Sequence, residues 1–200
     1  MPDASVERTI ARLENPRRLE ELPPRRLLEA AGLGPESYGR PLVIVDIGTG
    51  TGLYARALAG LLPNALIQAC DVSPAMIAYL AGRLASEESS LRRRVRPIQS
   101  ETRGLPLPDG SADLVLLVRV FHELEDPAAL LAEARRVLKP GGALVAADWR
   151  KEPTPKGPPL GQRLDAAEAL AVLAAAGFRG AAVFGSTGWD WIVSARKAAS

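Results

Sequence analysis

The segment most suited to chemistry is the glycine-rich run VDIGTGTG at residues 45–52. Asp46 closes an apolar stretch, and the three glycines that follow, Gly48, Gly50 and Gly52, lead directly into an apolar helical pattern. Glycines in such a turn allow positive φ angles and let a ligand approach the backbone without meeting a Cβ atom. The next helix would present free N–H groups and partial positive charge to the same space. The run predicts a site for a flat ligand with an anionic group, although it could also be a purely structural turn.

Two further positions narrow the kind of ligand. A dinucleotide fingerprint of the form G-x-G-x-x-G would need glycine where this chain has Leu53, so a pyrophosphate ligand fits poorly. Asp71 ends the next apolar stretch, where a carboxylate can accept hydrogen bonds from two ribose hydroxyls. A solvated carboxylate at a strand end is the alternative. Taken together with the glycine run, Asp71 favours a ligand that contains a nucleoside.

Two candidate catalytic residues follow later apolar stretches. His122 is the only histidine of the chain, and its ordinary pKa makes it a candidate general base. Asp148 closes the fifth apolar run and is a candidate for contacting a substrate. Ligands of open α/β sheets bind at the carboxyl ends of the strands, where both residues would lie. The alternatives are that His122 only shapes a pocket and that Asp148 is structural or solvated.

These residues are carried by short apolar runs that alternate with helical segments, a pattern typical of repeated β–α units and a parallel sheet. The last two apolar runs are joined too tightly for a parallel pair and predict an antiparallel hairpin. The arginine run at 92–96 favours a solvated loop over a phosphate site. The predicted strands are residues 42–46, 65–71, 95–99, 112–118, 142–148, 178–185 and 188–197. The predicted helices are residues 52–62, 73–86, 126–139 and 165–176.

The first part of the chain has a different character. Residues 1–40 are charged and helical in pattern, and Asn15-Pro16 and Pro23-Pro24 divide them into two or three short helices. We predict that residues 1–40 form a helical extension or lid and that residues 41–200 form the ligand-binding domain. Simple surface packing of the first segment is the alternative.

Composition excludes several classes of protein. The chain has 200 residues, of which 47% are hydrophobic and 24% charged, which fits one globular domain. A net charge of +2 gives no clear nucleic-acid or membrane signal. The single cysteine, Cys70, excludes an internal disulfide and a thiolate zinc cluster. Because no apolar run reaches about 18 residues, we expect a cytoplasmic protein without a metal centre and leave its oligomeric state open.

Over about residues 42–148 the chain resembles the class I methyltransferases that depend on S-adenosylmethionine (SAM), specifically those that act on small molecules. VDIGTGTG is similar to the first motif of that family, and ACDVSPAMI is similar to the second. SETRGLPLPDGSADLV and FHELEDPAALLAEARRVLKPGGALV resemble the segments that follow in the same order. The resemblance implies an α/β, Rossmann-like, doubly wound fold with a mostly parallel seven-stranded sheet, an antiparallel C-terminal hairpin and N-terminal helices.

The resemblance also implies SAM as the cofactor and assigns roles to residues. It places Asp71 at the ribose, Val72 and Met76 beside the adenine, and Glu101 at the adenine amino group. The backbone of Arg119 would meet the methionine amino group, although a long cation there departs from the family pattern. The full predicted cofactor set is Asp46, Gly48, Thr49, Gly50, Gly52, Asp71, Val72, Met76, Glu101, Thr102 and Arg119.

The predicted function is therefore methyl transfer from SAM to an unidentified small-molecule acceptor, with protein, RNA and lipid acceptors left open. Methyl transfer from a sulfonium is an in-line displacement that depends mainly on alignment, and only some acceptors need a general base. His122 and Asp148 are the candidate catalytic residues. A non-catalytic SAM-binding regulatory or partner subunit is the first alternative, and an NAD-dependent oxidoreductase is the second.

Overall fold

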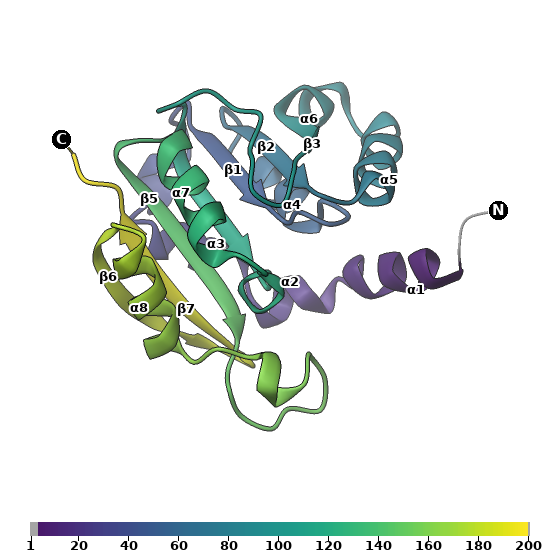
Figure 1. Ribbon diagram of the computed structural model, residues 1–200. Helices are drawn as coiled ribbons and strands as arrows, with labels where there is room; N and C mark the ends of the chain where they lie inside the picture. Colours follow the sequence, from purple (N-terminus) through teal and green to yellow (C-terminus); the bar gives the residue numbers. More distant parts are fainter. Residues whose placement is uncertain (1–3, 200) are drawn as a thin grey trace.

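In the computed structural model, which describes residues 4–199, seven strands form one sheet in the order β3-β2-β1-β4-β5-β7-β6 (Figure 1). Strands β1 to β5 pair in parallel, and β7 is antiparallel to both of its neighbours. This confirms the predicted Rossmann-like sheet with a C-terminal antiparallel hairpin. The strands are β1 (Val43–Ile47), β2 (Leu66–Asp71), β3 (Val95–Gln99), β4 (Ala112–Val118), β5 (Leu138–Trp149), β6 (Arg179–Thr187) and β7 (Asp190–Arg196).

Helices cover both faces of the sheet. Successive strand residues point to opposite faces, so Ile44 of β1 packs on one apolar core and Val45 on the other. Helices α3, α4 and α5 close the first core, while α7 and α8 close the second. The helices are α1 (Ala4–Leu13), α2 (Arg17–Glu21), α3 (Pro24–Ala30), α4 (Leu53–Leu61), α5 (Pro74–Ala85), α6 (Ser89–Arg94), α7 (Pro127–Val137) and α8 (Ala166–Ala175), with short 3-10 turns η1 (Pro35–Ser37), η2 (Phe121–Glu123) and η3 (Leu160–Gln162).

Two sequence predictions were wrong in detail. The arginine run is not a plain solvated loop, because it contains α6, and the Arg94 guanidinium donates to the carbonyl oxygens of Ala59 and Leu62 near the end of α4. These carbonyls lack partners inside their own helix, so a side-chain donor satisfies them. The helix predicted to reach residue 139 ends at Val137, and β5 begins at Leu138, which pairs with Ala112 of β4.

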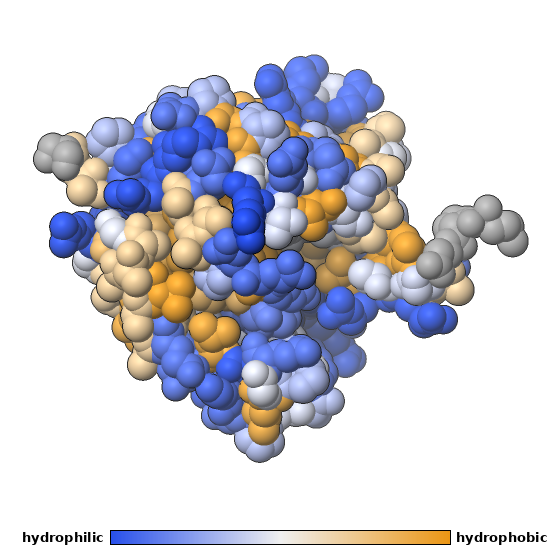
Figure 2. Space-filling model, viewed as in Figure 1, coloured by the Kyte–Doolittle hydropathy of each residue, from blue (hydrophilic) through white to orange (hydrophobic). Residues whose placement is uncertain are grey.

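Two segments lie at the carboxyl edge of the parallel strands, where the glycine run opens. Helix α1, which has no buried residue, runs along this edge, whereas Leu22, Leu27 and Leu28 of the following segment are fully buried in the first core. Residues 150–163 project beyond the end of β5 (Figure 1), and the projecting region is largely hydrophilic in the same view of the surface (Figure 2). Among residues 4–199, no helix is long and apolar enough to cross a membrane.

Candidate active site

A cavity of about 740 Å³ opens at the carboxyl ends of β1, β2 and β4. This volume lies within the range of small-molecule and cofactor sites. Gly52 is not among the described residues that line the cavity. The other residues predicted to bind cofactor all line it: Asp46, Gly48, Thr49, Gly50, Asp71, Val72, Met76, Glu101, Thr102 and Arg119.

The glycine run turns with positive φ angles, and its glycines serve different purposes. Gly50 has a φ of 55° and faces the cavity, where a Cβ atom would lie 3.0 Å from a methyl group of Leu13 in α1. Gly52 has a φ of 76°, and a Cβ atom there would lie only 2.3 Å from Leu80 of α5. Gly50 therefore lets Leu13 of α1 approach the backbone at the cavity, whereas Gly52 allows α4 and α5 to pack closely.

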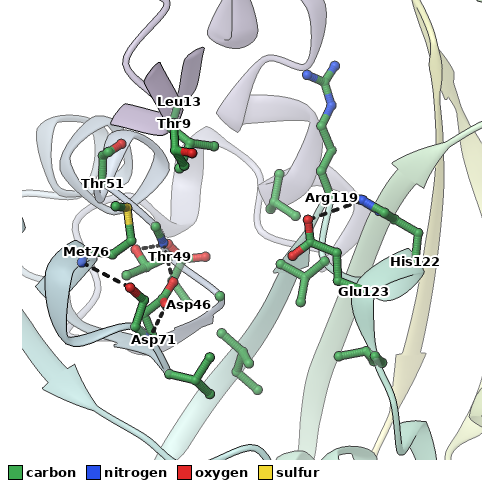
Figure 3. Close-up of a pocket in the computed structure, with 18 of the residues that line it drawn as sticks. Thr9, Leu13, Asp46, Thr49, Thr51, Asp71, Met76, Arg119, His122 and Glu123 are labelled. Carbon is green, nitrogen blue, oxygen red and sulfur yellow. Dashed lines mark hydrogen bonds and ion pairs between the residues drawn. The ribbon is translucent and has the colours of Figure 1, made fainter. Parts of the chain in front are cut away.

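Two carboxylates accept hydrogen bonds from the glycine run. Asp71 accepts hydrogen bonds from the backbone N–H of Gly50 at 2.7 Å and of Ser73 at 2.8 Å. Asp46 accepts one from the Thr49 hydroxyl at 2.6 Å (Figure 3). Burial raises the pKa of Asp46 to about 7, the nearby Asp71 adds to the rise, and the Thr49 hydrogen bond partly offsets it. A cationic ligand group beside Asp46 would favour its ionised form.

An apolar slot continues from Asp71 toward the predicted adenine side. Val72 is 54% exposed at the rim of the cavity, which is unusual for a large apolar side chain, and Met76 lies behind it in α5. Glu101 and Thr102 line the same cavity after β3. The exposed apolar surface beside a carboxylate suits a flat base with a polar edge.

His122 and Asp148 form a hydrogen-bonded pair at the opposite side of the cavity. The Nδ1 atom of His122 lies 2.8 Å from a carboxylate oxygen of Asp148, which also accepts from the His122 backbone N–H at 3.0 Å. Asp148 is 2% exposed and is not among the described residues that line the cavity, so it contacts the imidazole of His122 and not the cavity itself. The His122 Nε2 atom lies 3.4 Å from Glu123 (Figure 3).

The same neighbours determine the charge of His122. Burial alone would lower its pKa, but the hydrogen bond with Asp148 and the contact with Glu123 outweigh burial and raise the pKa to about 9. The pKa of Glu123 is lowered, chiefly by His122. The free protein therefore carries a cationic imidazole at neutral pH.

Arg119 reveals a charged network that the sequence reasoning missed. Its guanidinium binds the fully buried Asp190 through two hydrogen bonds, of 2.8 and 2.7 Å, and contacts Glu21 at 3.3 Å. It also lies 4.2 Å from the ring centroid of Trp149. Glu21 pairs in addition with Lys156 of the projecting segment. The available signal was an aspartate between two tryptophans in a predicted strand, but nothing along the chain indicated its partner.

The N-terminal helices complete the cavity wall. Thr9 and Leu13 of α1 lie over the glycine run (Figure 3), and Arg12 and Arg18 also line the cavity. The Tyr54 hydroxyl of α4 donates to the carbonyl oxygen of Arg18 at 2.8 Å, which ties α2 to the body of the protein. This position is compatible with the predicted lid.

With this geometry established, comparison with known proteins identifies the family. Residues 45–146 match the family model described as a methyltransferase domain. The chain belongs to the methyltransferase family. A crystal structure of a SAM-dependent methyltransferase from Aquifex aeolicus superposes with a TM-score of 0.84 and 30% sequence identity, over 94% of this chain and 96% of that chain.

Curated relatives match a shorter stretch. A demethylmenaquinone methyltransferase from Thermus thermophilus is 37% identical over 117 residues, covering 58% of this chain and 50% of the relative. A malonyl-[acyl-carrier protein] O-methyltransferase from Hahella chejuensis is 38% identical over 109 residues, covering 54% of this chain and 36% of the relative. The chain thus spans half or less of the length of these relatives.

The family match confirms SAM as the cofactor and favours it over a dinucleotide. The side chains present fit this ligand. Gly50 exposes its backbone to the cavity without a Cβ atom, Asp71 and Asp46 offer carboxylates for hydroxyl and cationic groups, and Val72 offers an exposed apolar surface for a base. No group of three or more potential metal ligands is present in the part of the chain that the structure describes.

Proposed function

We propose that this protein is an enzyme that transfers a methyl group from SAM to a small-molecule or carrier-bound acceptor. One observation carries the proposal: a single cavity is lined both by the glycine run and Asp71 and by the imidazole of His122. When bound, SAM supplies a methyl group already activated by its positive sulfur. The work left to the protein is to align the acceptor with that methyl group and to exclude water.

Each of the proposed cofactor residues would contact a different part of SAM. Asp71 would accept from the ribose, Val72 and Met76 would cover the adenine, and Glu101 would accept from its amino group. The backbone of Arg119 would face the methionine amino group, beside the ionised Asp46. In this arrangement His122, which lines the same cavity, would be available to the acceptor.

His122 would act as a general base for acceptors that must lose a proton. Asp148 holds its Nδ1 atom, so the Nε2 atom, which contacts Glu123 in the free protein, would accept a proton from the acceptor once it is itself unprotonated. Because its pKa in the free protein is about 9, kcat/KM should rise with pH and level off above about pH 9. The Asp148→Asn variant should shift this profile to lower pH, because a weaker partner no longer holds the imidazolium. A profile that falls through the same range would exclude the base role.

The names of the relatives indicate which kind of acceptor to propose. Their names describe methyl transfer to demethylmenaquinone and to malonyl-acyl carrier protein, and we propose an acceptor of comparable kind. The near-neutral net charge gives no reason to prefer nucleic acid, and a cytoplasmic location remains part of the proposal.

The decisive experiment uses methyl-labelled SAM and fractions of a cell extract, with each fraction tested against wild-type protein and the His122→Gln variant. Label transferred by the wild type but strongly reduced in the variant would support the enzyme and the role of His122. Tight SAM binding with no label transfer to any fraction would instead favour a non-catalytic SAM-binding subunit. Absence of SAM binding would refute the proposal as a whole.

A further inference from the structure

Among the described residues that line the cavity, Arg18 is a cation whose side chain has no partner in the network described above; the Thr51 hydroxyl is likewise buried without a partner but carries no charge. Within residues 4–199 the Arg18 side chain makes no hydrogen bond or ion pair, and its Nε atom is buried without a partner. Burying a cation without a partner is costly, because the charge loses its hydration and gains nothing in return. A ligand that supplies a negative group would remove this cost.

Other buried or half-buried arginines do have partners. Arg119 is neutralised by Asp190, and Arg56 pairs with Glu14 at 2.6 Å. Arg163 donates to the carbonyl oxygens of Pro158, Arg150 and Glu152. The Nε atom of Arg56 is also buried without a partner, but the rest of its guanidinium is paired, whereas the Arg18 side chain has no hydrogen bond or ion pair within residues 4–199.

The position of Arg18 is nevertheless well defined. Its carbonyl oxygen and that of Leu22 both accept hydrogen bonds from the Tyr54 hydroxyl, at 2.8 and 3.1 Å. Tyr54 is 5% exposed and belongs to α4, directly after the glycine run. The backbone of α2 is therefore hydrogen-bonded to α4, the helix that follows the glycine run. This contact fixes the backbone from which the Arg18 side chain reaches the cavity wall.

The charges around Arg18 show which side of the cavity it faces. Arg12 and Arg18 both help to lower the pKa of Glu123, after the larger effect of His122, so their positive field reaches the His122 side. Burial, and then the positive charge of Arg119, lower the pKa of Arg18 itself. A negative ligand group placed here would meet a cation that makes no ion pair with a carboxylate among residues 4–199, although Glu123 and Asp190 lie near enough to interact with its charge.

We propose that Arg18, with Arg12 beside it, forms a carboxylate-binding site on the N-terminal helices. The planar guanidinium fork matches the two oxygens of a carboxylate. The carboxylate could come from the methionine part of SAM or from the methyl acceptor. The proposal rests on the proposed function, since it assumes that the cavity holds SAM and an acceptor together.

The first experiment tests the cofactor as the source. Affinities for SAM and for 5′-methylthioadenosine, which lacks the carboxylate, are measured by calorimetry for the wild type and for the variants Arg18→Gln, Arg18→Lys and Arg17→Gln. If the carboxylate of SAM is the ligand, Arg18→Gln weakens SAM binding about 10- to 100-fold and leaves methylthioadenosine unchanged. Arg18→Lys, which keeps the charge but not the fork, should fall between. Arg17→Gln is the matched control, because Arg17 is exposed on the same helix outside the cavity.

The second experiment tests the acceptor as the source. Malonate is titrated into protein saturated with S-adenosylhomocysteine, whose own carboxylate already occupies any cofactor position. Suppose that malonate binds the wild type and the Arg17→Gln control but not Arg18→Gln, and that Arg18→Gln binds SAM as tightly as the wild type. These results would assign the site to the acceptor. The melting temperature of ligand-free Arg18→Gln should not fall, because the substitution breaks no contact.

The outcomes separate this inference from the proposed function. If SAM binds the wild type and neither SAM nor malonate distinguishes Arg18→Gln from it, the carboxylate site is refuted and the methyltransferase proposal stands. If the wild type binds neither SAM nor methylthioadenosine, the proposed function fails first. Malonate that binds wild-type protein without any nucleoside, and does so through Arg18, would still support a carboxylate site.

Discussion

The two ends of the cavity are built from different kinds of contact. At the nucleoside end, the backbone of the glycine run is held by Asp71, only 21 residues further along the chain. At the proposed acceptor end lies the side chain of Arg119, whose backbone is proposed to face the cofactor. This side chain binds Asp190 and Glu21, which are 71 and 98 residues away, and Lys156 binds Glu21 across 135 residues. The first end is a local backbone structure, whereas the second is an assembly of side chains from distant segments.

This difference suggests how each end can change. The nucleoside end depends on positive φ angles and on two backbone N–H groups, so few substitutions are compatible with it. The acceptor end depends on buried charges that must neutralise one another, so a change in one partner affects the others. The two ends, which we propose bind the cofactor and the acceptor, therefore have separate physical requirements.

The largest expected effect comes from breaking the buried pair at the acceptor end. Asp190→Asn leaves Arg119 without its main counter-charge, so the free energy of unfolding should fall by about 3 to 5 kcal/mol. Urea unfolding measures this change. Asp109→Asn is the control, because Asp109 pairs with Arg136 on an exposed surface and should give little change. Equal effects of the two substitutions would contradict the distinction between buried and surface pairs.

The next effect tests the nucleoside end. Gly50→Val places a branched side chain at a positive φ and in the space required by the ligand, so SAM affinity should fall by at least about 100-fold, measured by calorimetry. Gly110→Val is a matched control, since Gly110 has a similar φ of 58° but no atom within 4 Å of an added Cβ. A variant that melts as the control does and still binds SAM normally would refute the close approach of ligand and backbone.

A smaller loss of SAM affinity is expected when Asp71, which binds the backbone of the glycine run, is replaced. Asp71→Ala removes the proposed ribose acceptor and leaves the N–H groups of Gly50 and Ser73 without their partner. SAM binding should weaken by about 1 to 3 kcal/mol, the scale of charge-assisted hydrogen bonds. Calorimetry at fixed pH measures this loss, and an unchanged affinity would remove Asp71 from the ribose role.

The smallest effect concerns the protonation of Asp46. Its folded pKa of about 7 lies above the ordinary value of 3.8, so the contribution of Asp46 to stability is fully present below about pH 4 and is lost as pH rises through about 7. Asp46→Asn removes this dependence. The variant should gain stability over the wild type between about pH 4 and pH 7, levelling at on the order of 1 kcal/mol because the surroundings relax. Parallel stability curves for the two proteins across this range would exclude a buried, titrating Asp46.

Most of the fold followed from the pattern of the chain. The five parallel strands were predicted close to their observed positions, and the Asp165–Glu168 capping box at the start of α8 is present in the structure. The end of α7 was placed too late, because basic residues after Val137 fit a helix end as well as they fit an extended segment. Pairing of Leu138 with β4 decided between these possibilities.

The contacts of the candidate site also fall into those that the sequence could predict and those that it could not. The positions of Gly50 and Asp71 relative to one another could be predicted, because one β–α–β unit brings them together. The pairing of His122 with Asp148 could be anticipated only as two strand ends at one edge of the sheet. The contacts of Arg119 with Asp190, and the open position of Arg18, could not be predicted from their neighbours in sequence.

The amino-acid sequence by itself determined the sheet, the turn that receives a nucleoside, and the cofactor class, because hydrophobic periodicity and turn chemistry act over a few residues at a time. Only the tertiary structure decided which charges meet at the acceptor side. Ion pairs depend on distance in space, and the segments that carry Glu21, Arg119 and Asp190 come close together only after the whole sheet has formed.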